Sequence, residues 1–493
     1  MHAQLAAAAA GGADMAECRL DYLTPLPERA ALIAFFATSP LPLIVTFRPV
    51  RQGGRYAGDE DARLALLAEL APLAAAVDVE DDVPADRWPG APMVILSHHD
   101  FERCPDDLAG LATSMSQQPC DVVKIAFTAA GPEQAVAALD VVRQCPKPAI
   151  ILAMGEAGLI SRVLARKVGA FGTFAAVDAQ SGSAPGQPTL EQMKQLYRWD
   201  AINSATWVFG VVGCPISHSL SPAIHNAALA AMGVDGVYLP VRVEPGYEPF
   251  ERFMKAVTEQ VWLDWRGLSV TLPHKESALR YLGRERCEQL SARIGAVNTI
   301  SLRIDGSLHG ENTDYAAALV TLCDGLGIEP EQLSRQRAAV LGAGGVARAV
   351  VAGLLYAGAR VTIYNRNNER AEELAGEFGC AHQPWQQRHR LSDAIVINCT
   401  SIGMAPQAEQ SPLDRIPVGI KVVFDTIYTP LRTRLLDLAA AAGAKTISGL
   451  EMFINQAARQ FQAWTGKEAP RDLMRSVATE ALAGPAPQQE PEV

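Results

Sequence analysis

Short apolar runs alternate with Ala/Leu-rich segments of helical period in the first part of the chain. Segments such as 62–76 and 133–144 carry apolar residues at helical spacing between these runs. This alternation favours parallel β-strands joined by helical crossovers. Residues 1–14 indicate a helix with no strand before it. The predicted strands are the seven runs 16–22, 42–48, 75–80, 92–97, 121–127, 149–154 and 170–177.

Polar residues follow several of these runs at their C-terminal ends. Arg48 and Glu80 each end a run, and Ser97 is followed by His98 and His99. A parallel (β/α) barrel keeps its active site at this end of its strands. We therefore expect an α/β chain that begins with a (β/α)8-type barrel. Its first strand has no counterpart in the sequence, so closure of the barrel is left open.

The pattern starts again at Trp207, after a short joining segment at 199–206. A helix is expected at 222–232, and a long helix at 449–464 precedes a polar, Pro-rich tail, 484–493, that we expect to be disordered. The pattern predicts a small α/β domain followed by a Rossmann domain. The strands expected in this half are 208–213, 238–243, 267–272, 297–303, 338–345, 360–366, 394–400 and 421–428.

Composition and charge narrow the classes of function. Apolar residues make up 49% and charged residues 20%, which excludes disorder over most of the chain. No apolar stretch reaches the roughly 18 residues of a membrane helix, and the alanine run 6–10 lacks the basic flank of a secretory signal. A net charge of −11 argues against nucleic acid or an anionic membrane as a partner. An anionic ligand must therefore be held by a few local cations.

The nine cysteines have no zinc-type spacing, since no two lie within three positions of each other. We expect reduced thiols in a cytoplasmic protein without a metal site. The oligomeric state is left open.

A glycine-rich turn is the clearest local signal in the second half. GAGGVA (342–347) follows an apolar strand and opens a helix. Gly342 permits a tight turn, and Gly344 lets a pyrophosphate approach the backbone at the helix N-terminus. A plain tight turn is the alternative. The next strand ends in Asn365 and Arg366 where an NAD-binding domain usually has an acidic residue. Arg366 and Arg370 suit a 2′-phosphate, so we predict NADP.

Lys275 and Asp314 lie in the segments 267–276 and 310–315 and could supply acid–base chemistry to a hydride-transfer enzyme. Such a pair can shuttle the hydroxyl proton of an alcohol. A surface salt bridge is the more common explanation of one Lys and one Asp.

Motifs that cover nearly all of residues 207–466 resemble the shikimate dehydrogenase family. They include GCPISHSLSPAIHN (213–226), SVTLPHK (269–275), NTDY (312–315), NCTSIGM (398–404) and GLEMFINQA (449–457). The resemblance implies that Lys275 and Asp314 form the catalytic pair. It further implies a carboxylate site at Ser219 and Ser221 with Tyr428 nearby, and ring-hydroxyl contacts from Thr271, Asn298 and Gln456. The implied cofactor residues are Gly342, Ala343, Gly344, Gly345, Val346, Asn365, Arg366, Arg370 and Thr400.

Lys124 lies inside the apolar run DVVKIAF (121–127). An unpaired ammonium would be costly there, and a neutral amine could form a Schiff base with a carbonyl. A lysine that reaches solvent from a strand end is the alternative. SHHDF (97–101) adds a histidine that can serve as a base. Arg19, Arg48 and Arg162 could clamp a carboxylate and hydroxyls, although any one of them could be a plain salt bridge.

Residues 14–197 resemble type I 3-dehydroquinate dehydratase. The matching pieces are ECRLD (17–21), TFRPVRQGG (46–54), SHHDF (97–101), VKIA (123–126), MGEAGLISR (154–162) and SAPGQ (183–187). The resemblance implies a Schiff base at Lys124 and proton transfer by His99. It implies that Glu17, Arg19 and Arg48 line the site, and that Arg162, Ser183 and Gln187 contact the substrate.

Two residues depart from that family's pattern. Gln52 stands where a glutamate is common, and loss of its charge could lower the basicity of His99. His98 stands where an asparagine is common, and its role is left open. Neither change removes Lys124 or His99, so we expect an active dehydratase.

Together the resemblances imply a bifunctional enzyme of the shikimate pathway. The barrel would dehydrate 3-dehydroquinate, and the second half would reduce 3-dehydroshikimate to shikimate with NADPH. The expected domains are 1–198, 207–310 completed by the helix 449–480, and 311–448. One alternative is a catalytically weak barrel that serves as a scaffold or ligand-sensing module. The other is a quinate dehydrogenase.

Overall fold

The computed structural model describes residues 1–180, 182 and 184–484. The predictions for Ser183 and for a disordered tail over 485–493 lie outside these residues. The chain forms two compact units, Met1–His218 with Asp235–Trp265 and Ser219–Val234 with Arg266–Val493. In the part that the structure describes, no helix is long and apolar enough to cross a bilayer.

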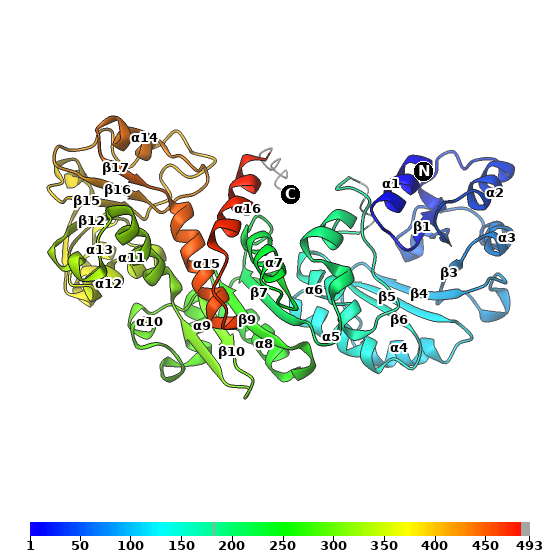
Figure 1. Ribbon diagram of the computed structural model, residues 1–493. Helices are drawn as coiled ribbons and strands as arrows, with labels where there is room; N and C mark the ends of the chain where they lie inside the picture. The colour runs from blue at the N-terminus through cyan, green and yellow to red at the C-terminus, as the bar shows by residue number, and fades with distance from the viewer. Residues whose placement is uncertain (181, 183, 485–493) are drawn as a thin grey trace. The chain divides into compact units, whose positions relative to one another are not determined.

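The first unit contains a curled, six-stranded parallel sheet whose strands follow chain order (Figure 1). Every residue of β2, β3 and β6 is buried, which is typical of parallel strands covered on both faces. The α/β class predicted for this half is confirmed. The strands are β1 (Ala16–Arg19), β2 (Leu43–Thr46), β3 (Ala76–Glu80), β4 (Val94–Asp100), β5 (Val122–Thr128) and β6 (Ala149–Met154).

Helices connect these strands and begin at residues that favour helix starts. Asp59 and Asp107 accept hydrogen bonds from the first turns of α3 and α4, and Pro132 opens α5. The helix predicted over 62–76 ends at Leu70 because Pro72 has no N–H to continue the helical hydrogen bonds, and a 3₁₀ turn over Ala71–Leu73 follows. The helices are α1 (His2–Ala10), α2 (Arg29–Ala37), α3 (Glu60–Leu70), α4 (Leu108–Ser116), α5 (Pro132–Gln144) and α6 (Leu159–Val163).

The strand predicted over 170–177 does not form. Phe171 N donates to Ala149 O at 2.9 Å, but Ala176 makes an isolated bridge with Thr189. A strand needs a continuous ladder with one neighbour, and this segment divides its hydrogen bonds between two. Among the described residues, β1 and β6 are therefore the two edges of the sheet, and no strand pairing closes it into a barrel.

The first unit also contains β7 (Trp207–Gly213), β8 (Gly236–Arg242) and α8 (Tyr247–Glu259). The two strands pair in parallel, as expected for the start of a second α/β pattern. Helix α8 buries one face through Phe250, Phe253 and Met254.

The second unit begins with an antiparallel group of strands. Strand β10 (Thr299–Leu302) pairs with β9 (Trp265–Val270) and with β11 (Leu308–Glu311). Helix α16 packs on α7 and α15. The helices of this group are α7 (Ser221–Ala231), α9 (Lys275–Leu282), α10 (Gln289–Ile294), α15 (Gly449–Thr465) and α16 (Arg471–Ala483).

A parallel sheet of order β14-β13-β12-β15-β16-β17 completes the second unit (Figure 1). The first strand in the chain lies in the middle and the order reverses beside it, which is the Rossmann arrangement that the sequence predicted. Its strands are β12 (Arg337–Leu341), β13 (Arg360–Asn365), β14 (Ala381–Pro384), β15 (Ile395–Asn398), β16 (Val422–Asp425) and β17 (Lys445–Ile447). Its helices are α11 (Thr313–Leu326), α12 (Gly345–Tyr356), α13 (Asn368–Phe378) and α14 (Arg434–Ala441).

Candidate active sites

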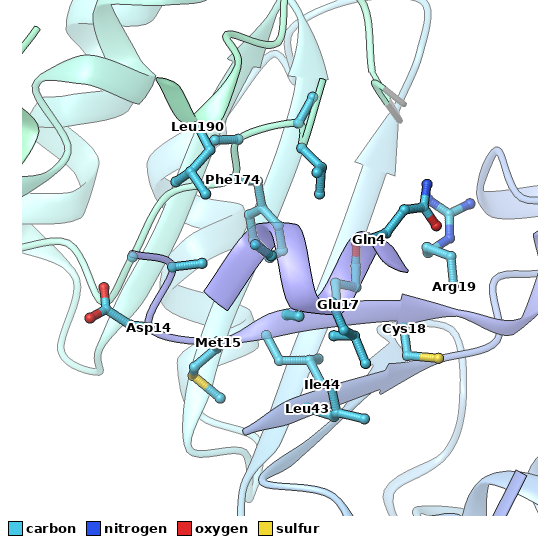
Figure 2. A pocket seen from close by; sticks show the side chains of 18 of the residues that line it. Gln4, Asp14, Met15, Glu17, Cys18, Arg19, Leu43, Ile44, Phe174 and Leu190 are labelled. Atoms are coloured by element: carbon cyan, nitrogen blue, oxygen red, sulfur yellow. The ribbon is translucent and has the colours of Figure 1, made fainter. Parts of the chain in front are cut away.

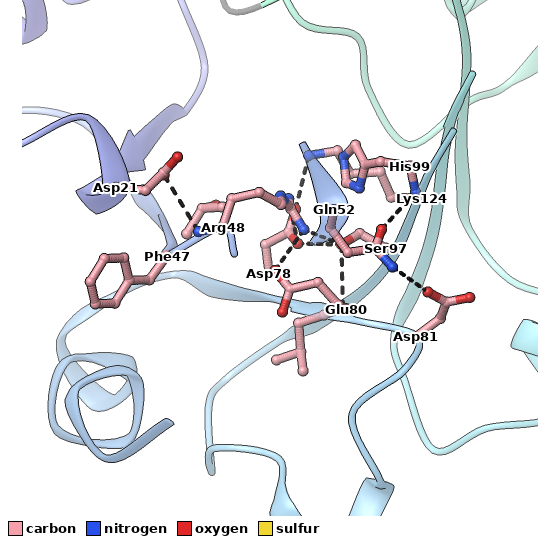
Figure 3. A network of polar contacts seen from close by, with 12 residues as sticks. Asp21, Phe47, Arg48, Gln52, Asp78, Glu80, Asp81, Ser97, His99 and Lys124 are labelled. Atoms are coloured by element: carbon pink, nitrogen blue, oxygen red, sulfur yellow. Dashed lines mark hydrogen bonds and ion pairs between the residues drawn. The ribbon is translucent and has the colours of Figure 1, made fainter. Parts of the chain in front are cut away.

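A network of buried polar contacts joins side chains of β3, β4 and β5 to Arg48, which follows β2 (Figure 3). Lys124 Nζ, on β5, lies 2.8 Å from Asp78 Oδ2 and 3.2 Å from Glu17 Oε1. Lys124 is therefore not the unpaired ammonium that its position in an apolar run suggested. Two buried carboxylates compensate the charge of Lys124 and fix the position of its nitrogen.

Asp78, on β3, is the centre of this network. Its carboxylate contacts Lys124, accepts from Ser97 Oγ at 2.5 Å and pairs with Arg48 at 2.8 Å. Burial raises the pKa of Asp78, but Arg48 and Lys124 lower it by more, so that it lies well below its usual range. The pKa of Glu17 is lowered in the same way, mainly by Lys124. Sequence reasoning missed Asp78. The available signal was two acidic residues, Asp78 and Glu80, alternating within an apolar strand.

Arg48 is held within the network. It is 2% exposed, and its guanidinium pairs with Asp78 and, at 2.9 Å, with Glu80. Glu80 also pairs with the buried Arg63 at 2.8 Å. Burial raises the pKa of Glu80 above its usual value. Two carboxylates of β3 thus fix the orientation of Arg48.

His99 is half-buried, and its buried Nδ1 atom has no hydrogen-bond partner among the described residues. Burial, together with the charges of Arg48 and Lys124, holds the pKa of His99 well below its usual value. Its imidazole is therefore neutral at physiological pH and can act as a base.

Gln52 holds His99 through the backbone. The His99 N–H donates to Gln52 Oε1 at 3.0 Å, and Gln52 Nε2 donates to Asp81 Oδ1 at 3.2 Å. Asp81 Oδ2 lies 2.9 Å from His98 Nδ1 and raises the pKa of His98. His98 thus belongs to a chain of contacts that ends at the main chain of His99.

Arg162, on α6, is a buried cation without a carboxylate partner among the described residues. It is 2% exposed, and burial lowers its pKa to about 10. One nitrogen donates to Phe174 O at 3.4 Å, and Nε has no partner. The ring of Phe174 lies 4.4 Å from Lys124 Nζ. A guanidinium in this state can bind an incoming carboxylate close to the network.

A cavity of about 430 Å³ opens beside β1. Glu17, Arg19, Phe174 and Gln187 are among its lining residues, and Figure 2 shows the first three around it. Arg19 forms two hydrogen bonds to Asp21 along the wall. The structure therefore brings Glu17, Arg19 and Gln187 to this cavity. It places Lys124, His99 and Arg48 in the polar network, and Glu17 belongs to both.

In the second unit, Lys275 Nζ lies 2.6 Å from Asp314 Oδ2. The two side chains come from the starts of α9 and α11, so the predicted pair is formed. Asn298 Nδ2 donates to the other oxygen of Asp314 at 2.8 Å. The side chains of Lys275 and Asp314 are largely buried, with exposed fractions of 17% and 12%. This is the arrangement that a proton relay requires.

Asn298 is itself fixed by its neighbours. Its Oδ1 accepts from Thr313 N at 2.7 Å and from Thr299 Oγ1 at 2.8 Å. Gln460 Nε2 donates to the same Thr299 hydroxyl at 2.9 Å. The network orients the amide so that its donor side faces Asp314.

The other residues predicted to bind the substrate lie outside the hydrogen-bond network of Lys275, Asp314 and Asn298 among the described residues. Ser219 Oγ accepts from Ser221 N at 3.3 Å at the start of α7. The ring of Tyr428 stacks on Phe453 at 4.9 Å. Among the described residues, no hydrogen bond joins the pair Lys275–Asp314 to Ser219, Ser221, Thr271, Tyr428 or Gln456.

The glycine-rich turn between β12 and α12 fits a dinucleotide pyrophosphate. Gly342 has φ +114°, and a Cβ there would lie 2.9 Å from Cys399 O. At Gly344 and Gly345 a Cβ would meet nothing within 4 Å. The backbone N–H groups of Gly345 and Val346 open α12 with this open space beside them, as phosphate binding requires. Ala343 is half-buried in the same turn.

Thr400 is tied to a buried carboxylate that sequence reasoning missed. Its Oγ1 donates to Asn398 Oδ1 at 2.7 Å, and Asn398 Nδ2 donates to Asp425 Oδ1 at 3.0 Å. Thr433 Oγ1 donates to the other oxygen of Asp425 at 2.6 Å. Burial raises the pKa of Asp425 to about 6, while these hydrogen bonds lower it.

Arg366 and Arg370 are exposed beyond β13, where a 2′-phosphate would lie. Asn365 Nδ2 donates to Asn367 O at 2.8 Å, and Asn367 caps α13 by accepting from Arg370 N at 3.1 Å. Arg366 also lines a cavity of about 400 Å³ together with Trp385, Arg388 and Arg434. Glu409 and Asp414 also line it, so the three arginines leave the lining with a small positive charge that suits a phosphate group.

The chain matches four known protein families along its length. Residues 1–204 match type I 3-dehydroquinase, and residues 211–300 match the shikimate dehydrogenase substrate binding domain. Residues 328–404 match shikimate/quinate 5-dehydrogenase, and residues 449–479 match the shikimate 5′-dehydrogenase C-terminal domain.

Individual relatives match either the whole chain or its second half. A chloroplastic bifunctional 3-dehydroquinate dehydratase/shikimate dehydrogenase from Arabidopsis thaliana is 37% identical, over 94% of this chain and 79% of that protein. An NADP(+) shikimate dehydrogenase from Methanosarcina acetivorans is 41% identical, over 56% of this chain and 98% of that protein. A crystal structure of a shikimate dehydrogenase in complex with NADP+ is 34% identical with a TM-score of 0.50, over 57% of this chain and 98% of that chain.

Proposed function

Because this chain belongs to the family of bifunctional 3-dehydroquinate dehydratase/shikimate dehydrogenases, we propose that its two sites catalyse consecutive reactions. The first dehydrates 3-dehydroquinate through a Schiff base on Lys124, and the second reduces 3-dehydroshikimate to shikimate with NADPH. The observation that carries the first assignment is the position of Lys124 close to His99. Arg162 supports it, because it donates to Phe174 O and the ring of Phe174 lies 4.4 Å from Lys124 Nζ.

Lys124 must be a neutral amine when it attacks the ketone. Its ammonium proton has to pass to a neighbouring base, and His99 is the uncharged base of the network. Lys124 Nζ then adds to the ketone carbon. The ketone oxygen takes one proton from the amine and one back from His99, and leaves as water, so that His99 is neutral again. The resulting iminium withdraws electrons from the adjacent carbon, so no metal is needed for this step.

His99 removes a proton from the carbon beside the iminium and forms an enamine. The enamine expels the hydroxyl group on the following carbon, which leaves as water after it takes the proton back from His99. Water then hydrolyses the iminium and releases 3-dehydroshikimate and free Lys124. The net change is the loss of one water. Arg162 would hold the substrate carboxylate throughout, since no carboxylate among the described residues pairs with it.

Borohydride trapping tests the Schiff base. The purified chain is mixed with 3-dehydroquinate and sodium borohydride, and its peptides are analysed by mass spectrometry. We expect a reduced adduct on the peptide that contains Lys124 and none in Lys124→Met. Lys147→Met, at another lysine of the same half, should keep the adduct. An adduct on a different lysine, or none in the wild type, would refute the assignment.

The second site supplies a proton to the ketone of 3-dehydroshikimate. NADPH, when bound, supplies the hydride, and the residues that would hold it are Gly342–Val346, Thr400, Arg366 and Arg370. Lys275 donates a proton to the developing alkoxide oxygen. Asp314 holds Lys275 at 2.6 Å and is itself held by Asn298. The buried start of α11 thereby keeps the donor in one position.

Replacement of Lys275 tests this role. Lys275→Ala should lower the rate of NADPH oxidation by roughly a thousandfold, because general acid catalysis contributes about 10²–10⁴-fold. Lys255→Ala, on the exposed face of α8, is the matched control and should keep the wild-type rate. Unchanged turnover in Lys275→Ala would refute the dehydrogenase assignment.

We also propose that the enzyme works in a reducing compartment such as the cytoplasm. All nine cysteines are free thiols in the structure, which suits such a compartment. Fractionation of the source cells tests this, and recovery in an organelle or secreted fraction would contradict it.

A further inference from the structure

An ion pair joins strand β8 to the turn that follows β6 of the parallel sheet. Arg242, the last residue of β8, donates from Nη1 to Glu156 Oε2 at 2.9 Å. Glu156 lies in the Gly155–Gly158 turn between β6 and α6. Both residues belong to the first unit, but Arg242 lies in the sequence that matches the shikimate dehydrogenase substrate binding domain and Glu156 in the sequence that matches type I 3-dehydroquinase.

The Gly155–Gly158 turn supports two elements of the dehydratase site. Gly155 N donates to Pro185 O at 3.0 Å, so the 184–187 loop rests on the turn. Gly186 has φ +67°, and a Cβ there would lie 2.4 Å from Gly155 C and 2.9 Å from Glu156 N. The loop and the turn are therefore packed backbone to backbone.

The other end of the turn leads into the helix that carries Arg162. Ser161 Oγ donates to Gly158 O at 2.7 Å and accepts from Ala153 N at 2.9 Å. A shift of the turn would therefore displace the loop that ends at Gln187 and, on the other side, the start of α6.

Arg242 lies between two carboxylates. Besides its contact with Glu156, its Nε donates to Glu244 Oε1 at 2.8 Å. The three side chains are 37%, 39% and 50% exposed, so solvent screens the pair in part. If Arg242 were removed, the carboxylates of Glu156 and Glu244 would face each other without a compensating positive charge. Their repulsion would favour displacement of the Gly155–Gly158 turn.

We propose that Arg242 is a positioning residue for the dehydratase reaction: through Glu156 it fixes the turn on which the substrate loop 184–187 rests. The inference rests on the proposed dehydratase function. It means that the second half of the fused sequence contributes a side chain to substrate binding in the first half. The effect should appear in KM for 3-dehydroquinate, because neither Arg242 nor Glu156 contacts Lys124 or His99.

Charge reversal and charge exchange test this inference in the full chain. Dehydratase turnover is followed by the absorbance of 3-dehydroshikimate without NADPH. Arg242→Glu should raise KM for 3-dehydroquinate by about tenfold with kcat within about twofold, since removal of an exposed pair and the added repulsion act together. The double variant Arg242→Glu/Glu156→Arg should return KM to within about threefold of the wild type.

A second ion pair of the same kind is the matched control. Arg252 Nε on α8 lies 3.4 Å from Glu133 Oε1 on α5, and it likewise joins the two parts of the sequence without contact to the 184–187 loop. Arg252→Glu should leave KM for 3-dehydroquinate within about twofold of the wild type. The thermal unfolding midpoint of each variant shows whether it is folded.

The outcomes separate this inference from the proposed function. A wild-type chain without dehydratase turnover would refute the proposed function and this inference with it. If the wild type is active but the variants Arg242→Glu and Arg252→Glu have the same KM for 3-dehydroquinate, this inference is refuted and the proposed function is not. Failure of the double variant to recover KM, with a normal unfolding midpoint, would also refute it.

Discussion

One carboxylate, that of Asp78, holds both Lys124 and Arg48 inside the first unit. Asp78 Oδ2 lies 2.8 Å from Lys124 Nζ, and Oδ1 lies 2.8 Å from Arg48 Nη2. Asp78 is fully buried, so neither cation has water as an alternative partner. The resting position of Lys124 on β5 therefore depends on a residue of β3, two strands away in the sheet.

Asp78→Asn should damage both stability and dehydratase activity. Removal of a buried counter-charge costs about 3 kcal/mol of unfolding free energy, and a displaced Lys124 should lower dehydratase kcat/KM by about a hundredfold. Denaturant unfolding and steady-state kinetics measure the two effects. Asp82→Asn, at an exposed ion pair with Arg51, should change either quantity little. Wild-type kinetics in Asp78→Asn would show that Lys124 does not need this carboxylate.

The acid limb of the dehydratase pH profile should reflect the lowered pKa of His99. The neutral imidazole is the base, so activity falls as pH drops through the pKa of His99. Because that pKa lies well below 6.5, kcat/KM at pH 6 should stay above half of its plateau. An acid limb with its midpoint at pH 6.5 or higher would contradict this account.

Gln52→Glu should move that acid limb toward higher pH. The new carboxylate would lie beside His99, where Gln52 now accepts from its backbone N–H at 3.0 Å. A nearby negative charge stabilises the imidazolium and raises its pKa. The comparison of the two pH profiles measures this shift, and an unchanged midpoint would count against it.

Arg162→Met should separate substrate binding from stability. The side chain is buried, and its charge has no carboxylate partner among the described residues. Its replacement by an apolar chain of similar length should raise the unfolding free energy by about 1 kcal/mol or more. It should also raise KM for 3-dehydroquinate by about a hundredfold, through loss of a charge-assisted bond to the carboxylate. Arg103→Met, on the surface, is the control for both measurements. Loss of stability in Arg162→Met would indicate an internal partner for the guanidinium.

Asp425 should make the Rossmann sheet less stable as pH rises through 6. Its pKa is raised from 3.8 to about 6 by burial, so the folded state binds more protons than the unfolded state between these values. Unfolding free energy therefore falls as pH rises from about 4 to above 6, by at most about 3 kcal/mol. Asp425→Asn removes this dependence, and unfolding curves of both proteins at pH 5 and pH 7.5 measure it. An equal pH dependence in the variant would refute the assignment.

Much of the site chemistry could be predicted because it lies where strands end. His99 and Arg48 stand near the C-terminal ends of apolar runs, and parallel strands bring these ends together. Lys124 stands out as a charge inside an apolar run. The turn at Gly342 was predictable because its glycines separate a strand from a helix. In both cases a local sequence pattern and a general rule of topology are sufficient to predict where the residues lie.

Other features depend on contacts that the sequence does not display. Asp78 and Glu80 alternate on a strand, but which cations face them is decided by the neighbouring strands. Gln52 contacts the backbone of His99, and no pattern along the chain indicates that. The segment 170–177 has the composition of a strand, yet its hydrogen bonds go to Ala149 and to residues 188–190 in place of one continuous ladder. Such outcomes follow from the tertiary neighbours of a segment.

The absorbance of NADPH after addition of 3-dehydroquinate alone tests most directly whether one chain carries out both reactions. We expect NADPH oxidation by the wild type, because the first site would generate the substrate of the second. Lys124→Met should oxidise NADPH only when 3-dehydroshikimate is supplied, and Lys275→Ala should oxidise it roughly a thousandfold more slowly than the wild type with either compound. A wild type that oxidises NADPH with 3-dehydroshikimate but not with 3-dehydroquinate would contradict the account of the first site.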